Sequence, residues 1–236
     1  MIWRGQGRTH KGRRPANEDA FVCRDGEGLW AVIDGMGGHE AGDLAASMVC
    51  ESLETLSLGG GIAHRLVAVE TALQTANHAI RHHAAINMRS KPMGATVAVL
   101  LVYRGEAAVV WAGDSRLYRY DGDGVAMLTR DHTPVQALVD AGELDEKQAM
   151  QHPRANVIYQ AVGIGERLQL DQIRFEPDHE QRFLLTSDGI HSVLAVDELT
   201  SLMRHGVTAS GVLKAALDRG SRDNVTAVVI AADAEE

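Results

Sequence analysis

Short apolar runs punctuated by glycine limit this chain to a small set of folds. The runs occupy positions 29–33, 95–102, 107–112, 183–186 and 225–231, and most of them close on a Gly or an Asp-Gly pair. Runs of this length, bounded by turn residues, predict β-strands. Several are apolar at successive positions instead of alternating, which indicates that both faces of the strand are covered. We therefore expect a sheet sandwiched between other layers, and not a sheet with one face in water.

Helical periodicity fills the gap between the first two of these strands. Six apolar residues recur there at alternating spacings of four and three, which places them on one helix face: Ile62, Leu66, Val69, Leu73, Ala76 and Ile80. A second helix is expected around 43–56, and this longer one must end before Pro92, because a residue preceding proline is pushed out of the helical region. The pair predicts an antiparallel helical hairpin. Two further helices are expected at 196–203 and 210–218, between the last two strands.

The middle of the chain predicts a meander followed by a polar insert. Residues 107–128 are expected to form sequential antiparallel strands, with turns at Gly113-Asp114 and at 121–124. The polar stretch 131–167 carries short helical pieces around 134–141 and 145–151, and is interpreted as a mobile insert over a site. No repeat, low-complexity tract or linker interrupts the chain, so we expect a single domain over 1–236.

Charge and cysteine content exclude several classes of protein. The chain has 23 Lys and Arg against 32 Asp and Glu, a net charge of −9, and its one basic stretch, 8–14, lacks the interleaved aromatics of a nucleic-acid groove. Two cysteines, Cys23 and Cys50, are interpreted as small buried hydrophobes in a reducing compartment. No apolar stretch approaches the roughly 20 residues that a membrane span needs. We therefore expect a cytoplasmic protein that binds neither nucleic acid nor membrane, with its eleven histidines on the solvated surface.

Acidic residues recur where predicted strands end. Asp34, Asp114, Asp188 and Asp223 each follow a strand or occupy a turn between strands, and the pair Glu18-Asp19 lies near the N-terminus. Carboxylates gathered at the ends of buried strands repel one another and resist desolvation unless a cation neutralises them. Oxygen ligands of this kind select Mg²⁺ or Mn²⁺. Taken singly, each Asp-Gly pair is more often only a turn, because Asp tolerates and Gly prefers left-handed backbone.

The local sequence motifs around these acids resemble those of a known family. Six motifs occur in order: Arg14-Pro15-Ala16-Asn17-Glu18-Asp19, Asp34-Gly35-Met36-Gly37-Gly38-His39, Gly94-Ala95-Thr96, Gly113-Asp114-Ser115-Arg116, Thr186-Ser187-Asp188-Gly189 and Arg222-Asp223-Asn224-Val225-Thr226. With them the chain resembles the metal-dependent protein phosphatases, the protein phosphatase 2C-like (PPM) family, and most of all its short stand-alone bacterial members. The resemblance implies an α+β fold, a four-layer α-β-β-α sandwich in which helices flank two antiparallel sheets.

The resemblance also implies roles for individual residues. Asp34 would bridge two Mn²⁺ or Mg²⁺ ions, the Gly35 carbonyl would bind one of them, and Asp188 and Asp223 would bind the other. Glu18 and Asp19 would act largely through water, and Asp114 would belong to a third, weaker site. The ions would supply an activated water for in-line attack on phosphorus. Arg14 would hold the phosphate with a bidentate fork, although by itself it reads as a solvated basic residue.

Two parts of the family pattern stay open in the sequence. Many eukaryotic members have a His after the metal-binding Asp-Gly that protonates the leaving group, and here this position is Met36. His39 is near, but a local hydrogen bond or a helix N-terminal role is as good an interpretation, so the general acid is left unassigned. The segment 131–165 matches the family's flap, and substrate contacts are expected there at Thr133 and Arg154.

The resemblance predicts a protein serine/threonine phosphatase that acts on phosphoserine and phosphothreonine and opposes a bacterial serine/threonine kinase. A kinase that controls type VI secretion is one such partner, and nothing in the sequence indicates an oligomer. The alternative is a pseudophosphatase, which binds a phosphoprotein or kinase without hydrolysis. A scaffolding role of the flap is a second alternative. The full set of strand-end aspartates argues against the pseudophosphatase, because a non-catalytic chain has no need of clustered buried acids. Activity with and without a chelator separates both alternatives from the phosphatase.

Overall fold

Two antiparallel five-stranded sheets form the centre of the computed structural model, which describes residues 2–38, 40–87, 93–145, 148–149 and 152–233. The first sheet has the strand order β1-β10-β9-β6-β7 and the second the order β2-β3-β4-β5-β8. The strands of the first sheet are β1 (Trp3–His10), β10 (Val225–Ala232), β9 (Arg182–Thr186), β6 (Arg116–Tyr120) and β7 (Val125–Met127). Those of the second are β2 (Asp19–Arg24), β3 (Leu29–Met36), β4 (Gly94–Tyr103), β5 (Glu106–Ala112) and β8 (Asp171–Phe175).

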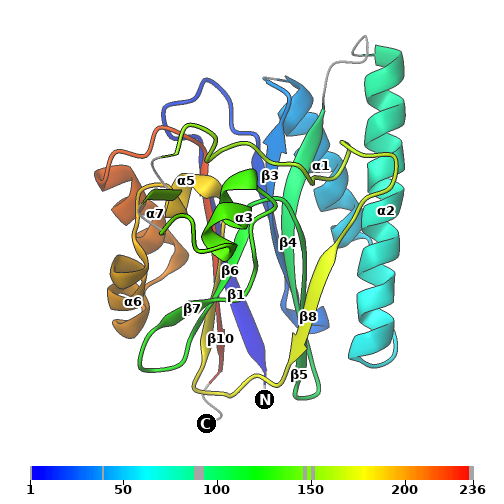
Figure 1. Cartoon of the computed structure of the whole chain (residues 1–236). Coiled ribbons are helices and arrows are strands. Elements are labelled where there is room, and N and C mark those ends of the chain that lie inside the picture. Colours follow the sequence, from blue (N-terminus) through cyan, green and yellow to red (C-terminus); the bar gives the residue numbers. More distant parts are fainter. Residues whose placement is uncertain (1, 39, 88–92, 146–147, 150–151, 234–236) are drawn as a thin grey trace.

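Helices cover the outer face of each sheet, so the molecule has four layers (Figure 1). Helices α1 (Glu40–Glu54) and α2 (Ile62–Asn87) pack on the second sheet and on each other. The first sheet is covered by α5 (Asp188–His191), α6 (Val196–Arg204) and α7 (Ala209–Asp218), while α3 (Pro134–Asp140) and a short 3₁₀ helix (Asp25–Glu27) lie in connections. Three apolar cores follow, one between the sheets and one under each helical layer. The predicted α-β-β-α sandwich and helical hairpin are confirmed.

The sequence does not predict strand β1, because this segment is polar and rich in glycine. The packing of the two sheets explains its glycines. A β-carbon on Gly5 would lie 2.2 Å from the Trp30 ring, and one on Gly7 would lie 2.2 Å from the Phe21 ring. The two aromatic rings of the second sheet therefore pack directly on the β1 backbone. Along its length β1 pairs with β10 from Trp3–Ala232 to His10–Val225. The glycines thus let the two sheets approach each other at this side of the sandwich.

The predicted meander over 107–128 is only partly correct. The turn at 121–124 joins β6 and β7 in an antiparallel hairpin, as expected. Strands β5 and β6, however, belong to different sheets, so the turn at Gly113-Asp114 carries the chain from one sheet to the other. Gly113 has φ +107°, and a β-carbon there would lie 2.5 Å from that of Thr96. A crossing this tight needs glycine, and it leaves Asp114 between the sheets.

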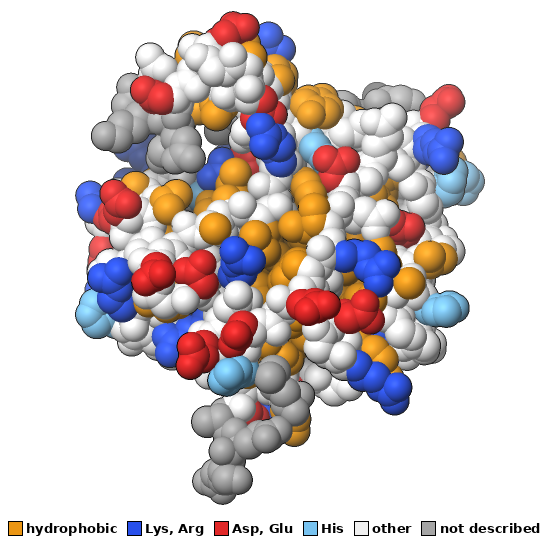
Figure 2. Space-filling model, turned by 60° about the horizontal axis from the view of Figure 1, so that its bottom comes forward, with side chains coloured by type: hydrophobic (Ala, Val, Ile, Leu, Met, Phe, Trp, Pro, Cys, Tyr) orange, Lys and Arg blue, Asp and Glu red, His pale blue; other side chains and the backbone are white. Residues whose placement is uncertain are grey.

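The two chain ends lie together at one end of the sandwich, and α5 lies at the other (Figure 1). The view from the side of the termini shows hydrophobic side chains in the middle of that face, with charged side chains of both signs around them (Figure 2). Among the described helices, none is long and apolar enough to cross a membrane. The cysteines differ from their expected burial, because Cys23 is exposed on β2 and Cys50 is half-buried.

Candidate active site

Five aspartates converge at the end of the sandwich that carries α5. Asp19 and Asp34 are direct cross-strand partners in the β2–β3 ladder. Asp188 is the first residue of α5, and Asp223 and Asp114 lie in the turns before β10 and after β5. Asp34 experiences the charges of Asp19, Asp188, Asp114 and Asp223 together. Strand topology therefore gathers acids that lie as far apart in the sequence as Asp19 and Asp223.

Asp34 lies at the centre of this group. Removal of its carboxyl from water, followed by repulsion from the other four aspartates, raises its pKa well above the usual range. Asp188 lies close to it, and the charges of the two carboxylates repel each other. Burial and repulsion by Asp223 raise the pKa of Asp188 to about 6. The protein alone therefore does not stabilise the full negative charge of this pair.

Asp19 is held by hydroxyl groups from the opposite sheet. Its Oδ2 accepts hydrogen bonds from Ser187 Oγ at 2.8 Å and from Thr226 Oγ1 at 2.6 Å. Its Oδ1 is buried and has no hydrogen-bond partner among the described residues. Burial raises the pKa of Asp19 to about 7, although both hydroxyls oppose the rise. An orphaned carboxylate oxygen in an acidic cluster fits a cation or an ordered water bound to one.

Asp114 extends the cluster toward a buried ion pair. Burial, together with repulsion from Asp188 and Asp131, raises its pKa to about 8, and the nearby Arg116 opposes this rise. Arg116 pairs with Asp131 through hydrogen bonds of 2.9 Å from Nε and 2.6 Å from Nη2. Asp131 opens the predicted flap, so this pair fixes the root of the flap beside Asp114.

Close backbone packing positions Glu18 and Gly35 at the N-terminal part of α1. The Gly35 amide donates to the Glu18 carbonyl at 3.0 Å. A β-carbon on Gly35 would lie 2.1 Å from the Gly42 carbonyl oxygen, and one on Gly42 would lie 1.9 Å from Oε2 of Glu18. These two glycines therefore form a cradle for the Glu18 carboxylate at the edge of the acidic cluster.

Arg14 is the cation at the rim of the cluster. Its Nε and Nη2 donate to the two carboxylate oxygens of Asp223 at 2.8 Å and 2.6 Å. These hydrogen bonds, with the Asp223 charge, raise the pKa of Arg14, and more distant charges on Asp188 and Glu18 contribute. The guanidinium is largely exposed, with 59% of its side chain accessible, so a ligand in solution can reach it.

The donor set tests whether a metal fits here. Its members are carboxylates and backbone carbonyls, which are the ligands of Mg²⁺ and Mn²⁺. The pKa values of the Asp19 and Asp34 carboxyls are raised, and the buried Oδ1 of Asp19 has no hydrogen-bond partner among the described residues. A divalent ion would offset the repulsion among these acids. Within the described ranges, no three His, Cys, Asp or Glu side chains form a complete ligand group by themselves. The residues fit ions that take part of their ligands from water and backbone.

Comparison with known proteins decides the family. A family model described as protein phosphatase 2C matches residues 6–218. The chain belongs to the protein phosphatase 2C family.

Relatives of this phosphatase cover nearly its whole length. The serine/threonine phosphatase stp of Listeria innocua is 29% identical over 235 residues, which are 94% of this chain and 93% of the relative. The solved structure of PppA, described as a key regulatory component of the T6SS in Pseudomonas aeruginosa, is 34% identical with a TM-score of 0.91 and 99% of both chains covered. The catalytic domain of PstP in complex with two manganese ions is 28% identical with a TM-score of 0.84, over 98% of this chain and 99% of that one.

The predicted flap borders a cavity of about 280 Å³ next to the acids of this phosphatase. Asp114 and Asp188 line one side, and Thr133, Val135 and Val139 of the flap line another. Thr133 also caps α3, because its hydroxyl accepts a hydrogen bond from the Gln136 amide at 3.0 Å. Arg154 is exposed and does not line the cavity. His39 and parts of 145–151 lie outside the described residues.

Several neighbours of the site were missed by sequence reasoning. Ser187, Thr226 and Asn224 belong to the motifs, but their hydrogen bonds depend on which strands become adjacent. The side-chain oxygen of Asn224 accepts from the Glu18 amide at 2.8 Å, and its Nδ2 donates to the Lys11 and Ala16 carbonyls. His191 and His132 are buried, contrary to the expected surface position, and His191 lines the cavity.

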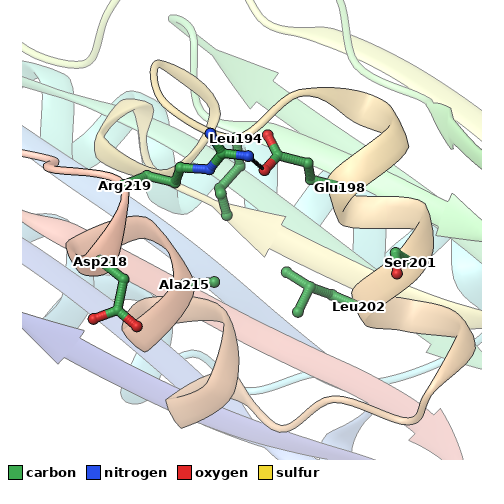
Figure 3. Close-up of a pocket in the computed structure, with 7 residues that line it drawn as sticks. All are labelled: Leu194, Glu198, Ser201, Leu202, Ala215, Asp218 and Arg219. Atoms are coloured by element: carbon green, nitrogen blue, oxygen red, sulfur yellow. Dashed lines mark hydrogen bonds and ion pairs between the residues drawn. The ribbon is translucent and has the colours of Figure 1, made fainter.

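A second cavity, of about 460 Å³, lies between α6 and α7 (Figure 3). Glu198 and Arg219 form an ion pair at its rim, and Leu202 and Ala215 line its apolar part. None of the predicted site residues lines this cavity. The acidic cluster therefore remains the candidate active site.

Proposed function

We propose that this phosphatase removes phosphate from phosphoserine and phosphothreonine side chains with Mg²⁺ or Mn²⁺ held by its clustered carboxylates. The single observation that carries the proposal is the convergence of Asp19, Asp34, Asp114, Asp188 and Asp223, most with raised pKa values, beside an exposed Arg14. Family membership supports the reaction, and serine/threonine phosphatases among the relatives support the substrate class.

The proposed ligand set is the one that the family resemblance implies, and the position of Asp34 among the other acids supports it. Asp34, at the centre, would be shared by two ions, with the Gly35 carbonyl on one side and Asp188 and Asp223 on the other. Glu18 and Asp19 would hold ordered waters around them, and Asp114 would serve a third, weaker site. When bound, divalent ions supply an activated water and positive charge that complements the phosphoryl transition state.

Arg14 would bind and orient the phosphate. Its planar fork already engages one oxyanion group, the Asp223 carboxylate, in a bidentate manner, and a phosphate presents the same pair of acceptors. Asp223 would keep the guanidinium aimed at the site between turnovers. No side chain is assigned as general acid, since Met36 occupies the position expected for one.

The proposal extends to the protein's setting. We place the phosphatase in the cytoplasm as a monomer, with a phosphoprotein substrate and a cognate serine/threonine kinase. Similarity to PppA, which is described as a regulatory component of the T6SS, supports a kinase of type VI secretion as that partner.

One assay separates the proposal from a pseudophosphatase, which is the disfavoured alternative. Phosphothreonine and phosphotyrosine peptides are incubated with Mn²⁺, and in parallel with EDTA. We expect phosphate release from the phosphothreonine peptide with Mn²⁺ alone. Equal release with EDTA would contradict the metal assignment, and no release from any substrate would favour the pseudophosphatase.

A further inference from the structure

The two turns that frame Asp223 bring together basic residues from opposite ends of the sequence. Lys11 and Arg13 lie in the turn after β1, and Arg222 immediately precedes Asp223. The Arg13 amide donates to the Arg222 carbonyl at 3.2 Å. These segments run side by side above the ends of β1 and β10 (Figure 1). We name the side chains of Lys11, Arg13 and Arg222 the basic lip.

Backbone contacts hold the basic lip against the active site. A β-carbon on Gly12, between Lys11 and Arg13, would lie 1.9 Å from the carbonyl oxygen of Asp223. The Lys11 carbonyl accepts hydrogen bonds from the Arg14 amide at 3.1 Å and from Asn224 Nδ2 at 2.9 Å. The backbone of this turn is therefore fixed beside Asp223.

The charges of the basic lip are available to a ligand. All three side chains are exposed, and none has a hydrogen bond or ion pair with any residue that the structure describes. Arg14, which lies beside them, is instead paired with Asp223. The chain has a net charge of −9, so most of its surface repels an acidic ligand. The three cations of the basic lip attract such a ligand instead.

We infer that the basic lip binds Asp and Glu side chains that flank the scissile residue of a phosphoprotein. The inference rests on the proposed function and names its substrate class. A phosphate held at Arg14 places the neighbouring substrate residues over Lys11, Arg13 and Arg222, since three extended residues span about 10 Å. The anion at the lip is not hydrolysed and serves only recognition.

The test compares three substrates of the intact protein with Mn²⁺. These are a phosphothreonine peptide with Glu flanks, the same peptide with Gln flanks, and a small aryl phosphate. The variant K11Q/R13Q/R222Q removes the charges, and R204Q in the last turn of α6 is the control for charge loss elsewhere. We expect kcat/KM for the Glu-flanked peptide to fall by about tenfold in the triple variant, as three exposed ion pairs together allow. The other two substrates and the control variant change less than about twofold.

Charge reversal gives a readout that a structural role would not produce. K11E/R13E/R222E should prefer a Lys-flanked peptide over the Glu-flanked one, and this preference should shrink as salt rises. Equal turnover of Glu- and Gln-flanked peptides by the unaltered protein would overturn the inference alone. So would an equal loss for all three substrates in the triple variant. Absence of turnover with every substrate would instead overturn the proposed function, and the inference with it.

Discussion

The guanidinium of Arg14 and the carboxylate of Asp223 form a bidentate pair, with donor–acceptor distances of 2.8 Å and 2.6 Å. The two residues are 209 positions apart, and each is expected to bind a different component of the reaction. Arg14 is assigned to the substrate phosphate and Asp223 to a metal ion. Under the proposed function this pair would link phosphate binding to metal binding, and substitution of Arg14 would separate the two.

Replacing Arg14 by Ala should weaken phosphate binding more than metal binding. Hydrogen bonds to charged groups contribute about 1.5–3 kcal/mol, so KM for an aryl phosphate should rise by about tenfold to a hundredfold. The Mn²⁺ concentration for half-maximal activity should change much less, because Asp223 keeps its carboxylate. The measurement is a steady-state titration of substrate and of Mn²⁺, with Arg13→Ala as the neighbouring control. An unchanged KM would refute the role of Arg14.

Stability of the metal-free protein should fall as pH rises from about 6 to about 8. Burial raises the pKa of Asp19 to about 7 and that of Asp114 to about 8, so in this window the folded state binds more protons than the unfolded state. Unfolding free energy then decreases with pH. Mn²⁺ should reduce this fall, because it replaces the lost protons as the neutralising charge.

The pH effect is measured as Tm in EDTA and in Mn²⁺ across that range. Asp114→Asn, which has no proton to lose, should flatten the curve in EDTA. A metal-free Tm that stays constant or rises between pH 6 and pH 8 would show that these carboxyls are not forced together as described.

The two glycines at the edge of the cluster should respond differently to a methyl group. Gly35→Ala drives its β-carbon into the backbone oxygens of Gly42 and Glu18, and such overpacking costs about 1–3 kcal/mol of stability. Gly42→Ala meets first the movable end of Glu18, so it should cost less stability but raise the Mn²⁺ requirement. Thermal unfolding and Mn²⁺ titration of both variants check this order. A reversed order of Tm losses would contradict the cradle.

Hydrophobic patterns in the sequence predicted the strands and helices whose residues form such a pattern along the chain. Strands β3 and β4 are apolar over most of their length, and α2 carries its core face at regular spacing, so these elements are visible in the sequence. Strand β1 is not, because its glycines are explained only by the rings of Trp30 and Phe21 on the other sheet. The switch of sheets at Gly113 is hidden for the same reason, since a tight turn between two strands looks like a hairpin.

The acids of the site were predicted by their motifs, but their surroundings were not. Ser187 and Thr226 reach Asp19 only because β10 joins β9 and lies near β2. The burial of His191 depends on how α5 packs on β9, β10 and α7. The basic lip was also missed, because Arg222 is more than two hundred residues from Lys11 and Arg13 in the sequence. Contacts across sheets have no local signature.

Phosphate release from a phosphothreonine peptide by the Asp34→Asn variant tests the metal centre most directly. The variant removes the charge at the centre of the cluster and relieves repulsion among the other acids, so the metal-free protein should remain folded with a Tm no lower than that of the unaltered protein. Asp123→Asn, in the exposed β6–β7 turn, is the matched control. We predict that Asp34→Asn loses Mn²⁺-dependent release and the rise of Tm with Mn²⁺, while the control keeps both. Turnover retained by folded Asp34→Asn would contradict the account.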